Sequence, residues 1–345
     1  MPGSTPSPRR ISLRDIARQA GVSVGSVSSV LTNRHLERRI PDATAEKIRK
    51  VAKKLGYLPN INARRLRGSA RLKNSILLAL VTSFEAPLPL VHHFIAALHK
   101  QTREGKGAIA DNTFSLMIEM FSAGRLKEMP GLLTGDRFNA AILLNTVAED
   151  DLFLTRVHLP YPAVLVNRSI PGYSEVLESD ECGVRPAEIF AKMGRKRFAV
   201  LYGNPFTQIT RTRVDSFLRR SEERLGRAPA EIIADSLSEQ AAYKAVHAHL
   251  AGRERGRGDR FDALYTVSDT LAVGAYRAIK EQGLRIPKDI AVIGVGDYGM
   301  SPFLDPPLSS VGVAYEELAK QASILLLRQL IQGEGTSPRV ILPLQ

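Results

Sequence analysis

Residues 21–33, GVSVGSVSSVLTN, carry side chains well suited to contact a nucleic acid, although none of them is charged. Serine hydroxyls can hydrogen-bond to phosphates or base edges, and valine methyl groups can contact the methyl group of thymine. Small side chains also let a helix backbone approach its partner closely. A small packing helix within a helical bundle is the alternative interpretation of the same run.

The positive charge of the chain is concentrated in its first fifth. Residues 1–74 contain 17 Lys and Arg against 4 Asp and Glu, which accounts for the whole formal excess of +13. The rest of the chain is balanced, with 31 residues of each sign. A compact basic module on a neutral body indicates a polyanionic partner for the module alone. The alternative is a solvated basic tail, against which the helical patterning of the segment argues.

Apolar spacing predicts two short helices before and within the uncharged run. Ser12 can cap the first helix, Asp15 can complete a capping box, and Gly21 ends the helix. Ser23 can cap the second helix, which we expect to run to about Thr32. The residues expected on its inner face are Val24, Val27, Val30 and Leu31.

A third helix is predicted to begin at Asp42 or Thr44 and to stop at Gly56. Its expected inner residues are Ile48, Val51, Ala52 and Leu55. Two short helices joined by a glycine turn are typical of a helix-turn-helix, whose second helix enters the major groove of DNA. The basic flanks would then supply the attraction to phosphates, so the second helix needs no charge of its own.

Residues 13–33, LRDIARQAGVSVGSVSSVLTN, and 47–68, KIRKVAKKLGYLPNINARRLRG, resemble the DNA-binding head and hinge of the LacI/GalR family. The resemblance implies that the start of the second helix reads the major groove. It also implies that a hinge helix enters the minor groove of operator DNA, where Leu66 wedges into a base step. Ser29 stands where the family usually has Arg, so a different half-site preference is expected. The expected DNA-contacting residues are Ser12, Arg14, Ser23, Val24, Gly25, Ser26, Ser28, Ser29, Asn33, Tyr57, Asn60, Ala63, Arg64 and Leu66.

From Ser75 onward, short apolar runs alternate with helical stretches. The runs are ILLALVT, FSLMIEMF, AAILLN, AVLVN, FAVLYG, ALYTV and IAVIGVG. This alternation predicts βαβ units and a parallel sheet. Seven or more strands over this length fit two lobes better than one.

The body resembles the LacI/GalR effector core, which has a type I periplasmic-binding-protein fold. The resemblance is strongest at residues 193–203, MGRKRFAVLYG, and 267–297, VSDTLAVGAYRAIKEQGLRIPKDIAVIGVGD. The expected fold is an N-terminal all-α helix-turn-helix head plus an α/β two-lobed core. The expected segments are a disordered tail (1–10), the head (11–58), the hinge helix and linker (59–74) and the core (75–345). Within the core we expect an N-lobe (about 75–178 and 313–332) and a C-lobe (about 179–312 and 336–345).

Ligands in such folds bind between the lobes, where strand ends and loops converge. The resemblance implies that Arg213 grips effector oxygens, while a surface ion pair is its alternative role. Asp269 can instead cap a helix, and Asp297 can instead be structural in a turn. Gly296 and Leu237 stand where many members have Asp and an aromatic residue, which leaves a sugar, a charged effector or a degenerate pocket open. The expected effector-binding residues are Ser83, Asn167, Arg213, Ser268, Asp269 and Asp297.

Other classes of protein are disfavoured. The N-terminal residues lack the apolar run of a secretory signal, and no apolar stretch is long enough to span a bilayer. Cys182 is the single cysteine, which favours a reducing cytoplasm. We find no nucleophile–base set and no metal cluster, so we expect no enzyme, no cofactor and no metal.

The sequence and the resemblance therefore predict a cytoplasmic, homodimeric transcriptional regulator. Repression released by an inducer is the usual mode of the family, and control by a corepressor or activation are the alternatives. The expected partners of the chain are double-stranded operator DNA and a small-molecule effector, a sugar or a derivative of one. The resemblance implies a dimer, because some members of the family form tetramers through a C-terminal helix and the sequence RVILPLQ shows no heptad pattern of that kind. A soluble solute-binding protein with the same core is the alternative, and it predicts a signal peptide and no basic head.

Overall fold

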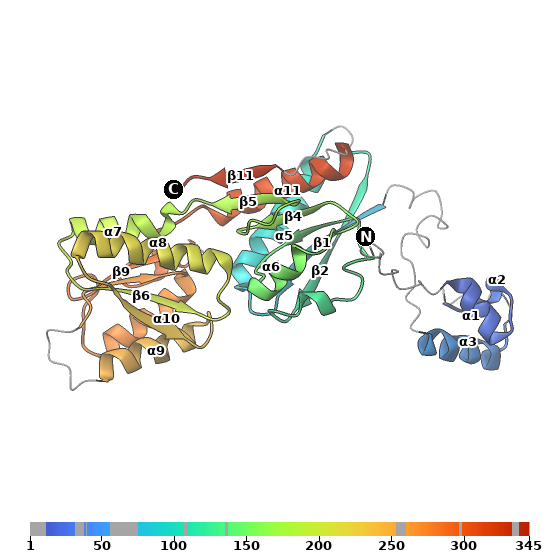
Figure 1. Ribbon diagram of the computed structural model, residues 1–345, viewed down its shortest axis with the longest axis horizontal. Helices are drawn as coiled ribbons and strands as arrows, with labels where there is room; N and C mark the ends of the chain where they lie inside the picture. The colour runs from blue at the N-terminus through green and yellow to red at the C-terminus, as the bar shows by residue number, and fades with distance from the viewer. Residues whose placement is uncertain are drawn as a thin grey trace, which may run out of the picture. The chain divides into compact units, whose positions relative to one another are not determined.

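The computed structural model describes residues 12–31, 38, 40–55, 75–106, 109–134, 137–252, 260–296, 299–332 and 338–344. The chain forms two compact units, Met1–Lys73 and Asn74–Gln345. The first is helical and the second is built from two parallel sheets covered by helices (Figure 1). In the described part of the chain, no helix is long and apolar enough to cross a membrane.

The first unit contains three helices among its described residues, α1 (Leu13–Ala20), α2 (Val24–Leu31) and α3 (Asp42–Lys54). The predicted capping box is present, because Asp15 N donates to Ser12 Oγ at 3.3 Å and Ser12 N donates to Asp15 Oδ2 at 2.9 Å. Gly21 ends α1 in the left-handed conformation, at φ 66°.

The helices of this unit share one small core. Its buried members are Ile16, Ala17, Ala20, Val27, Val30, Ala45, Ile48 and Ala52. The prediction that Val24 faces inward is wrong, since its side chain is 40% exposed. Val24 is the first residue of α2 and lies about 120° around the helix from Val30, so it falls at the edge of the inner face and stays exposed.

The second unit contains two fully parallel sheets. The strands of the first are β1 (Ser75–Ser83), β2 (Thr113–Phe121), β3 (Ala140–Leu143), β4 (Ala163–Val166), β5 (Ser174–Glu178) and β11 (Arg339–Leu342). The strands of the second are β6 (Phe198–Gly203), β7 (Ala230–Ala234), β8 (Ala263–Thr266), β9 (Ala291–Val295) and β10 (Ser309–Val311). Their spatial orders are β11-β5-β4-β3-β1-β2 and β10-β9-β8-β6-β7.

Helices cover both faces of each sheet. They are α5 (Leu88–Glu104), α6 (Ala148–Leu154), α7 (Glu181–Lys192), α8 (Gln208–Leu225), α9 (Glu239–Ala251), α10 (Asp269–Glu281) and α11 (Tyr315–Gln332), with 3₁₀ turns η3 (Leu126–Glu128) and η5 (Ser301–Phe303). On the second sheet, α7 and α8 lie on one face and α9 and α10 on the other (Figure 1). Burial on both faces explains why these strands are continuously apolar rather than alternating. In β1, for example, Leu78 and Leu80 belong to one core cluster, and Ala79 and Val81 to another.

The C-terminal strand belongs to the first sheet. The prediction that residues 336–345 join the C-lobe is therefore wrong for β11, which pairs in parallel with β5, with Leu342 opposite Glu178. The physical reason is the position of α11, which packs on β3, β4 and β5. A helix on this sheet returns the chain to the open edge of β5, as in a parallel crossover.

Candidate functional sites: the start of α2 and the boundary between the sheets

The start of α2 is fixed by a serine cap. Ser26 N donates to Ser23 Oγ at 3.0 Å, and the hydroxyls of the two residues lie 2.9 Å apart. Val27 and Val30, 0% and 1% exposed, anchor the inner face of the helix. The first turn of α2 is thus held rigidly while Ser23, Val24 and Gly25 stay exposed.

Gly25 lies in this exposed turn without an internal reason to be glycine. A Cβ atom added there would meet only Ser23 Oγ, at 3.6 Å, which is an ordinary van der Waals contact. Glycine in a helix costs about 1 kcal/mol relative to alanine. The residue therefore weakens α2 without relieving any clash within the described part of the unit.

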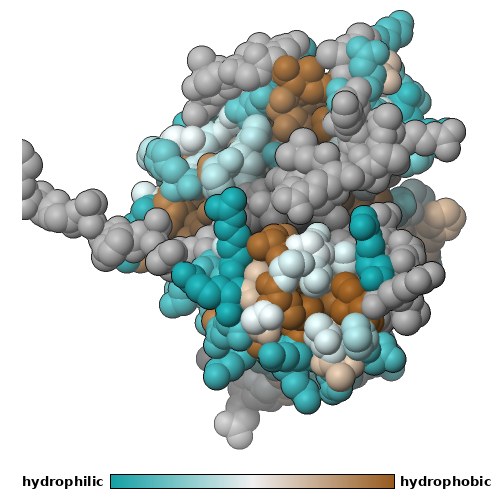
Figure 2. All heavy atoms as spheres, turned by 90° about the vertical axis from the view of Figure 1, so that its right-hand side faces the viewer, coloured by the Kyte–Doolittle hydropathy of each residue, from teal (hydrophilic) through white to brown (hydrophobic). Residues whose placement is uncertain are grey.

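The helices that pack against α2 carry exposed basic side chains. Arg14 and Arg18 on α1, and Lys47, Arg49 and Lys50 on α3, are exposed. Two of them have acidic neighbours, Arg18 with Asp15 at 2.5 Å and Lys50 with Glu46 at 3.4 Å. The space-filling view shows hydrophilic side chains around a smaller area of pale and brown ones (Figure 2). A surface of this kind suits a polyanion, because its rim supplies charge and its centre supplies close approach.

Eight of the predicted DNA-contacting residues are described. Ser12, Arg14, Ser23, Val24 and Gly25 are exposed, and Ser26, Ser28 and Ser29 are half-buried. The hydroxyl of Ser12 already donates to Asp15 Oδ2 at 2.6 Å, so this residue has a structural role in the cap. The remaining predicted residues lie outside the described residues; they are Asn33, Tyr57, Asn60, Ala63, Arg64 and Leu66.

A pocket of about 370 Å³ lies in the second unit where elements of the two sheets meet. It is formed by the segments that follow β4 and β5, by the first turn of α8 and by β11. Its lining residues are Asn167, Arg168, Ser169, Leu177, Glu178, Ser179, Asp180, Gln208, Ile209, Thr212, Arg339 and Ile341. Ser169 N donates to Gln208 Oε1 at 2.9 Å, which links the two sides of the pocket.

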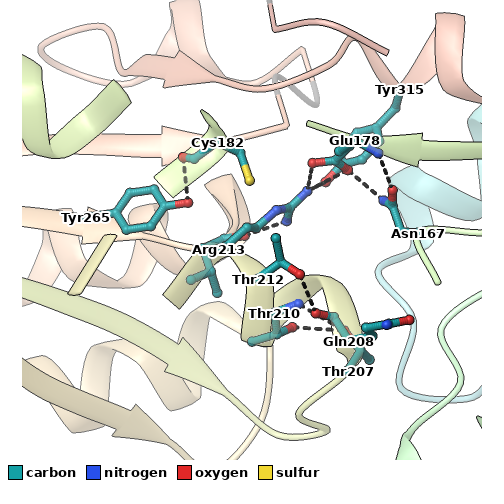
Figure 3. A network of polar contacts seen from close by, with 11 residues as sticks. Asn167, Glu178, Cys182, Thr207, Gln208, Thr210, Thr212, Arg213, Tyr265 and Tyr315 are labelled. Atoms are coloured by element: carbon teal, nitrogen blue, oxygen red, sulfur yellow. Dashed lines mark hydrogen bonds and ion pairs between the residues drawn. The ribbon is translucent and has the colours of Figure 1, made fainter. Parts of the chain in front are cut away.

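Arg213 lies beside this pocket and is buried, with 5% of its surface exposed, so the alternative of a surface ion pair is wrong. Its Nη2 donates to Glu178 Oε2 at 2.6 Å, to Glu178 Oε1 at 2.7 Å and to the Tyr315 hydroxyl at 3.1 Å (Figure 3). Its Nη1 donates to the carbonyl oxygen of Val267 at 2.8 Å. Burial acts to lower the pKa of Arg213, but the Glu178 carboxylate opposes it and the pKa is raised, so the guanidinium stays charged.

Asn167 holds the carboxylate of Glu178 in place. Asn167 Nδ2 donates to Glu178 Oε1 at 2.7 Å, and Glu178 N donates to Asn167 Oδ1 at 2.9 Å (Figure 3). Asn167 adopts a left-handed backbone conformation, φ 57°, which asparagine tolerates better than most residues. Asn167 thus orients Glu178 toward Arg213 from the end of the neighbouring strand.

Tyr315 occupies the space that a side chain at position 296 would need. A Cβ atom on Gly296 would lie 2.4 Å from the Tyr315 ring, and Gly296 has φ 118°. The glycine that replaces the aspartate expected from the resemblance therefore allows Tyr315 to reach Arg213. This arrangement explains the departure from the family pattern as a repacking of the site.

The other predicted effector residues lie elsewhere. Ser83 is 0% exposed and accepts a hydrogen bond from Asn145 Nδ2 at 2.6 Å. Ser268 caps α10, with its side chain accepting from Thr270 N. The carboxylate of Asp269 is fully buried and accepts from Ser310 Oγ at 2.8 Å and from Ser301 Oγ at 3.2 Å.

Asp297, the last predicted effector residue, lies outside the described residues. Of the predicted effector set, the structure brings together Asn167 and Arg213, through Glu178. In the described ranges, no group of three or more His, Cys, Asp or Glu residues could hold a metal ion.

Glu178 and Tyr315 are the residues of this network that the sequence analysis missed. Glu178 ends the strand SEVLE, and its burial is known only from the structure. Tyr315 has no sequence signal of its own. Its role depends on its contact with Arg213, 102 positions earlier in the sequence.

Two family models match the chain. Residues 12–60 match the model for bacterial regulatory proteins of the lacI family, and residues 187–345 match a periplasmic binding protein-like domain. The first match spans the helical unit with the exposed start of α2. The second spans the strands β6 to β10 of the second sheet and continues through α11 to β11 of the first sheet.

Similar proteins extend the resemblance over nearly the whole chain. The Ribose operon repressor of Haemophilus influenzae is 27% identical over 92% of this chain and 91% of its own. The HTH-type transcriptional regulator GalS of Salmonella typhimurium is 28% identical over 92% of this chain and 89% of its own. A crystal structure of the lac repressor dimer bound to operator and the anti-inducer ONPF is 25% identical, with a TM-score of 0.67 over 98% of this chain and 97% of that one.

Proposed function

We propose that the chain is a DNA-binding transcriptional repressor of the LacI family, and that a small-molecule effector controls its binding to a specific operator. The observation that carries the DNA-binding half of this proposal is the first turn of α2, which exposes Ser23, Val24 and Gly25. The net charge of +13 in residues 1–74 supplies the sequence-independent attraction to phosphates. A cytoplasmic location is part of the proposal.

Base recognition in this proposal is shared between α2 and the hinge. Val24, Gly25 and Ser26 contact base edges in the major groove, where their small side chains suit thymine methyl groups and close approach. Leu66, which lies outside the described residues, wedges into a base step in the minor groove and bends the duplex. Sequence is then read partly through the deformability of that step.

A homodimer would place two heads on a pseudo-palindromic operator. The lac repressor, 25% identical, is described as a dimer bound to operator, which supports this assembly. The second unit also carries exposed apolar residues on β2, at the edge of the first sheet: Leu116, Ile118 and Met120, which are 36%, 45% and 36% exposed. Apolar side chains on an unpaired edge strand favour a partner surface.

The effector site in this proposal is the pocket between the ends of β4 and β5 and the start of α8. Its lining residues come from the first sheet with its loops and from α8, which packs on the second sheet, so a ligand there can favour one relative arrangement of the two sheets over another. Such a ligand changes operator binding only by its differential affinity for the two arrangements. The anti-inducer bound in the lac repressor structure supports an effector, and it leaves the identity of this chain's effector open.

The experiment that tests the function compares the full chain with the fragment 75–345 on duplex DNA. The fragment has no net charge, because its 31 Lys and Arg balance 31 Asp and Glu. We expect the full chain to bind and to lose roughly 10³–10⁵-fold in affinity between about 50 and 200 mM salt, as release of counterions requires for 6–10 phosphate contacts. Equal binding by the fragment, or binding by the full chain that is insensitive to salt, contradicts the proposal.

A further inference from the structure

One face of the first sheet forms a wall of the pocket at the start of α8. Leu177 of β5 and Ile341 of β11 lie opposite each other in the parallel register, and both line the pocket. Their neighbours Val176 and Leu342 belong instead to the core cluster that contains residues of α11. Because side chains alternate between the two faces of a strand, the pocket lies on the face that α11 does not cover.

Arg168 is a buried cation in the lining of this pocket, with 2% of its surface exposed. Its Nε and Nη1 are buried and have no hydrogen-bond partner among the described residues. Removing a charged group from water without such partners is costly. Burial accordingly lowers the pKa of Arg168 to about 10, which still leaves it charged at neutral pH. Arg168 is thus a desolvated cation with donors to offer.

The two carboxylates whose charges act on Arg168 are engaged with other groups. They belong to Asp151 and Asp150, and they favour its charged form. Asp151 Oδ1 accepts a hydrogen bond from Thr146 Oγ1, and Asp150 Oδ2 accepts one from Gly124 N at 2.9 Å. In the part of the chain that the structure describes, neither carboxylate accepts a hydrogen bond from Nε or Nη1 of Arg168. The protein therefore supplies negative charge at a distance but no acceptor for these donors.

The other charges in the lining are paired or open to solvent. Glu178 is bound to Arg213, with Nη2 and Oε2 2.6 Å apart. Arg339 and Asp180 are exposed, so water and salt screen their charges. Among the lining residues, Arg168 is therefore the buried charge that lacks a counter-ion in contact with it.

The start of α8 adds positive potential to the same pocket. Gln208, Ile209 and Thr212, from the first turns of this 18-residue helix, line the pocket. Backbone N–H groups in the first turn of an α-helix have no partner within the helix, and this end of a helix favours negative charge. The pocket thus combines a helix start with Arg168, which follows β4, and both favour an anion.

We propose that the pocket binds a small organic anion, and that the carboxylate or phosphate group of this compound pairs with Arg168. The inference rests on the proposed function only in calling the compound the effector. Its charged group supplies the acceptors that Nε and Nη1 lack, in charge-assisted hydrogen bonds. The apolar side chains of Leu177, Ile209 and Ile341 contact its carbon skeleton. A neutral compound would leave the charge of Arg168 without a counter-ion.

The test measures the thermal midpoint of the full chain in sodium acetate, sodium phosphate and sodium chloride at equal ionic strength. Tyrosine fluorescence follows the second unit, since eight of the nine tyrosines lie beyond residue 73. We expect acetate, phosphate or both to raise the midpoint with rising concentration relative to chloride, as mass action requires for a ligand of the folded state. Acetamide, a neutral compound of the same shape as acetate, should not raise it. The larger response identifies carboxylate or phosphate as the preferred group.

Arg168→Met removes the cation and keeps much of its apolar bulk. We expect the apparent affinity for the anion that raises the wild-type midpoint to fall at least about tenfold. Arg277→Met is the matched control, because it removes an exposed arginine that pairs with Glu281 at 2.9 Å, and it should respond like wild type. All of these proteins keep the basic residues 1–74, so anion binding there and general effects of salt cancel in the comparison.

A second variant leaves Arg168 in place. Ile341 lines the pocket and is 57% exposed, so Ile341→Glu adds a carboxylate at a position that tolerates it. Ile233 on β7 is 59% exposed and is not a lining residue, which makes Ile233→Glu its control. Because like charges repel, the anion response should weaken in Ile341→Glu and not in Ile233→Glu. This pair decides the question if Arg168→Met does not fold.

The proposal is overturned by any of three results. One is an anion response of Arg168→Met equal to that of wild type or, where that variant does not fold, an equal response of Ile341→Glu. Another is a wild-type midpoint that acetate and phosphate raise no more than chloride does. The third is an equal rise in acetamide. None of these readouts involves DNA, so failure here is distinguishable from failure of the repressor function.

Discussion

The start of α2 and the boundary between the two sheets use their polar groups in opposite ways. At the start of α2, Ser23, Val24 and Gly25 are exposed on a rigid turn, and nothing within the unit requires their small size. At the boundary, Arg213 and Glu178 are buried and satisfy each other. The first region leaves small polar and apolar side chains open to solvent, whereas the second pairs the charges of Arg213 and Glu178 within the protein.

The glycines of the two units differ in how much space surrounds them. A Cβ atom on Gly183 of α7 would lie 2.3 Å from the Arg213 carbonyl oxygen, and one on Gly274 of α10 would lie 2.0 Å from the Glu239 carbonyl oxygen. These glycines let neighbouring helices pack closely. Gly25 has no such close neighbour, so packing within its own unit does not require a glycine there. The reason for a glycine can therefore be found by asking what its missing Cβ would touch.

The largest expected loss of stability comes from breaking the buried ion pair between Arg213 and Glu178. Arg213→Ala leaves the Glu178 carboxylate buried without its cation, and we expect the free energy of unfolding to fall by about 3–5 kcal/mol. Urea denaturation of the full chain measures this. The matched control is Arg277→Ala, which removes an exposed arginine paired with Glu281 and should change stability little. Equal losses of unfolding free energy in the two variants would mean that Arg213 and Glu178 do not form a buried ion pair.

A smaller loss is expected at a glycine that the core requires. Gly183→Ala places a methyl group 2.2 Å from Ser216 Oγ and 2.3 Å from the Arg213 carbonyl oxygen, so α7 and α8 must move apart. Overpacking of this kind costs about 1–3 kcal/mol. Urea denaturation again provides the measurement. An unchanged free energy of unfolding would show that the contact between α7 and α8 yields easily, and the contrast with Gly25 would then weaken.

Much of the helical unit could be predicted from sequence, because its signals are local. The capping box at Ser12 and Asp15 and the glycine stop at Gly21 each depend on residues a few positions apart, and all are confirmed. Val24 was predicted to face inward and is exposed. Apolar spacing could not decide this, since a valine at the edge of the apolar stripe fits either position.

The boundary between the sheets was harder to predict, because it depends on contacts between distant residues. Arg213 was chosen as a ligand residue, and the structure adds that it is 102 positions from Tyr315 and 35 from Glu178, both of which it contacts. The placement of β11 in the first sheet likewise depends on where α11 packs. No periodicity within the strand itself carries that information.

Loss of the first helix cap should lower the free energy of unfolding by about 1 kcal/mol. Ser12→Ala removes the acceptor for Asp15 N, and substitutions of this type usually cost about 0.5–2 kcal/mol. Circular dichroism of the full chain during urea titration reports the helical unit. If stability is unchanged and only DNA affinity falls, the hydroxyl of Ser12 belongs with the outward-facing residues of α2 instead.

The measurement that tests the central contrast most directly is the DNA affinity of Gly25→Ala. Alanine should raise helix stability by up to about 1 kcal/mol, because no internal contact opposes its methyl group. We predict that affinity for a duplex selected by the wild-type protein falls at least about tenfold, or 1.4 kcal/mol, while affinity for random duplex at the same salt concentration is unchanged. Unchanged affinity for the selected duplex would contradict the account, since Gly25 would then have neither an internal nor an external role.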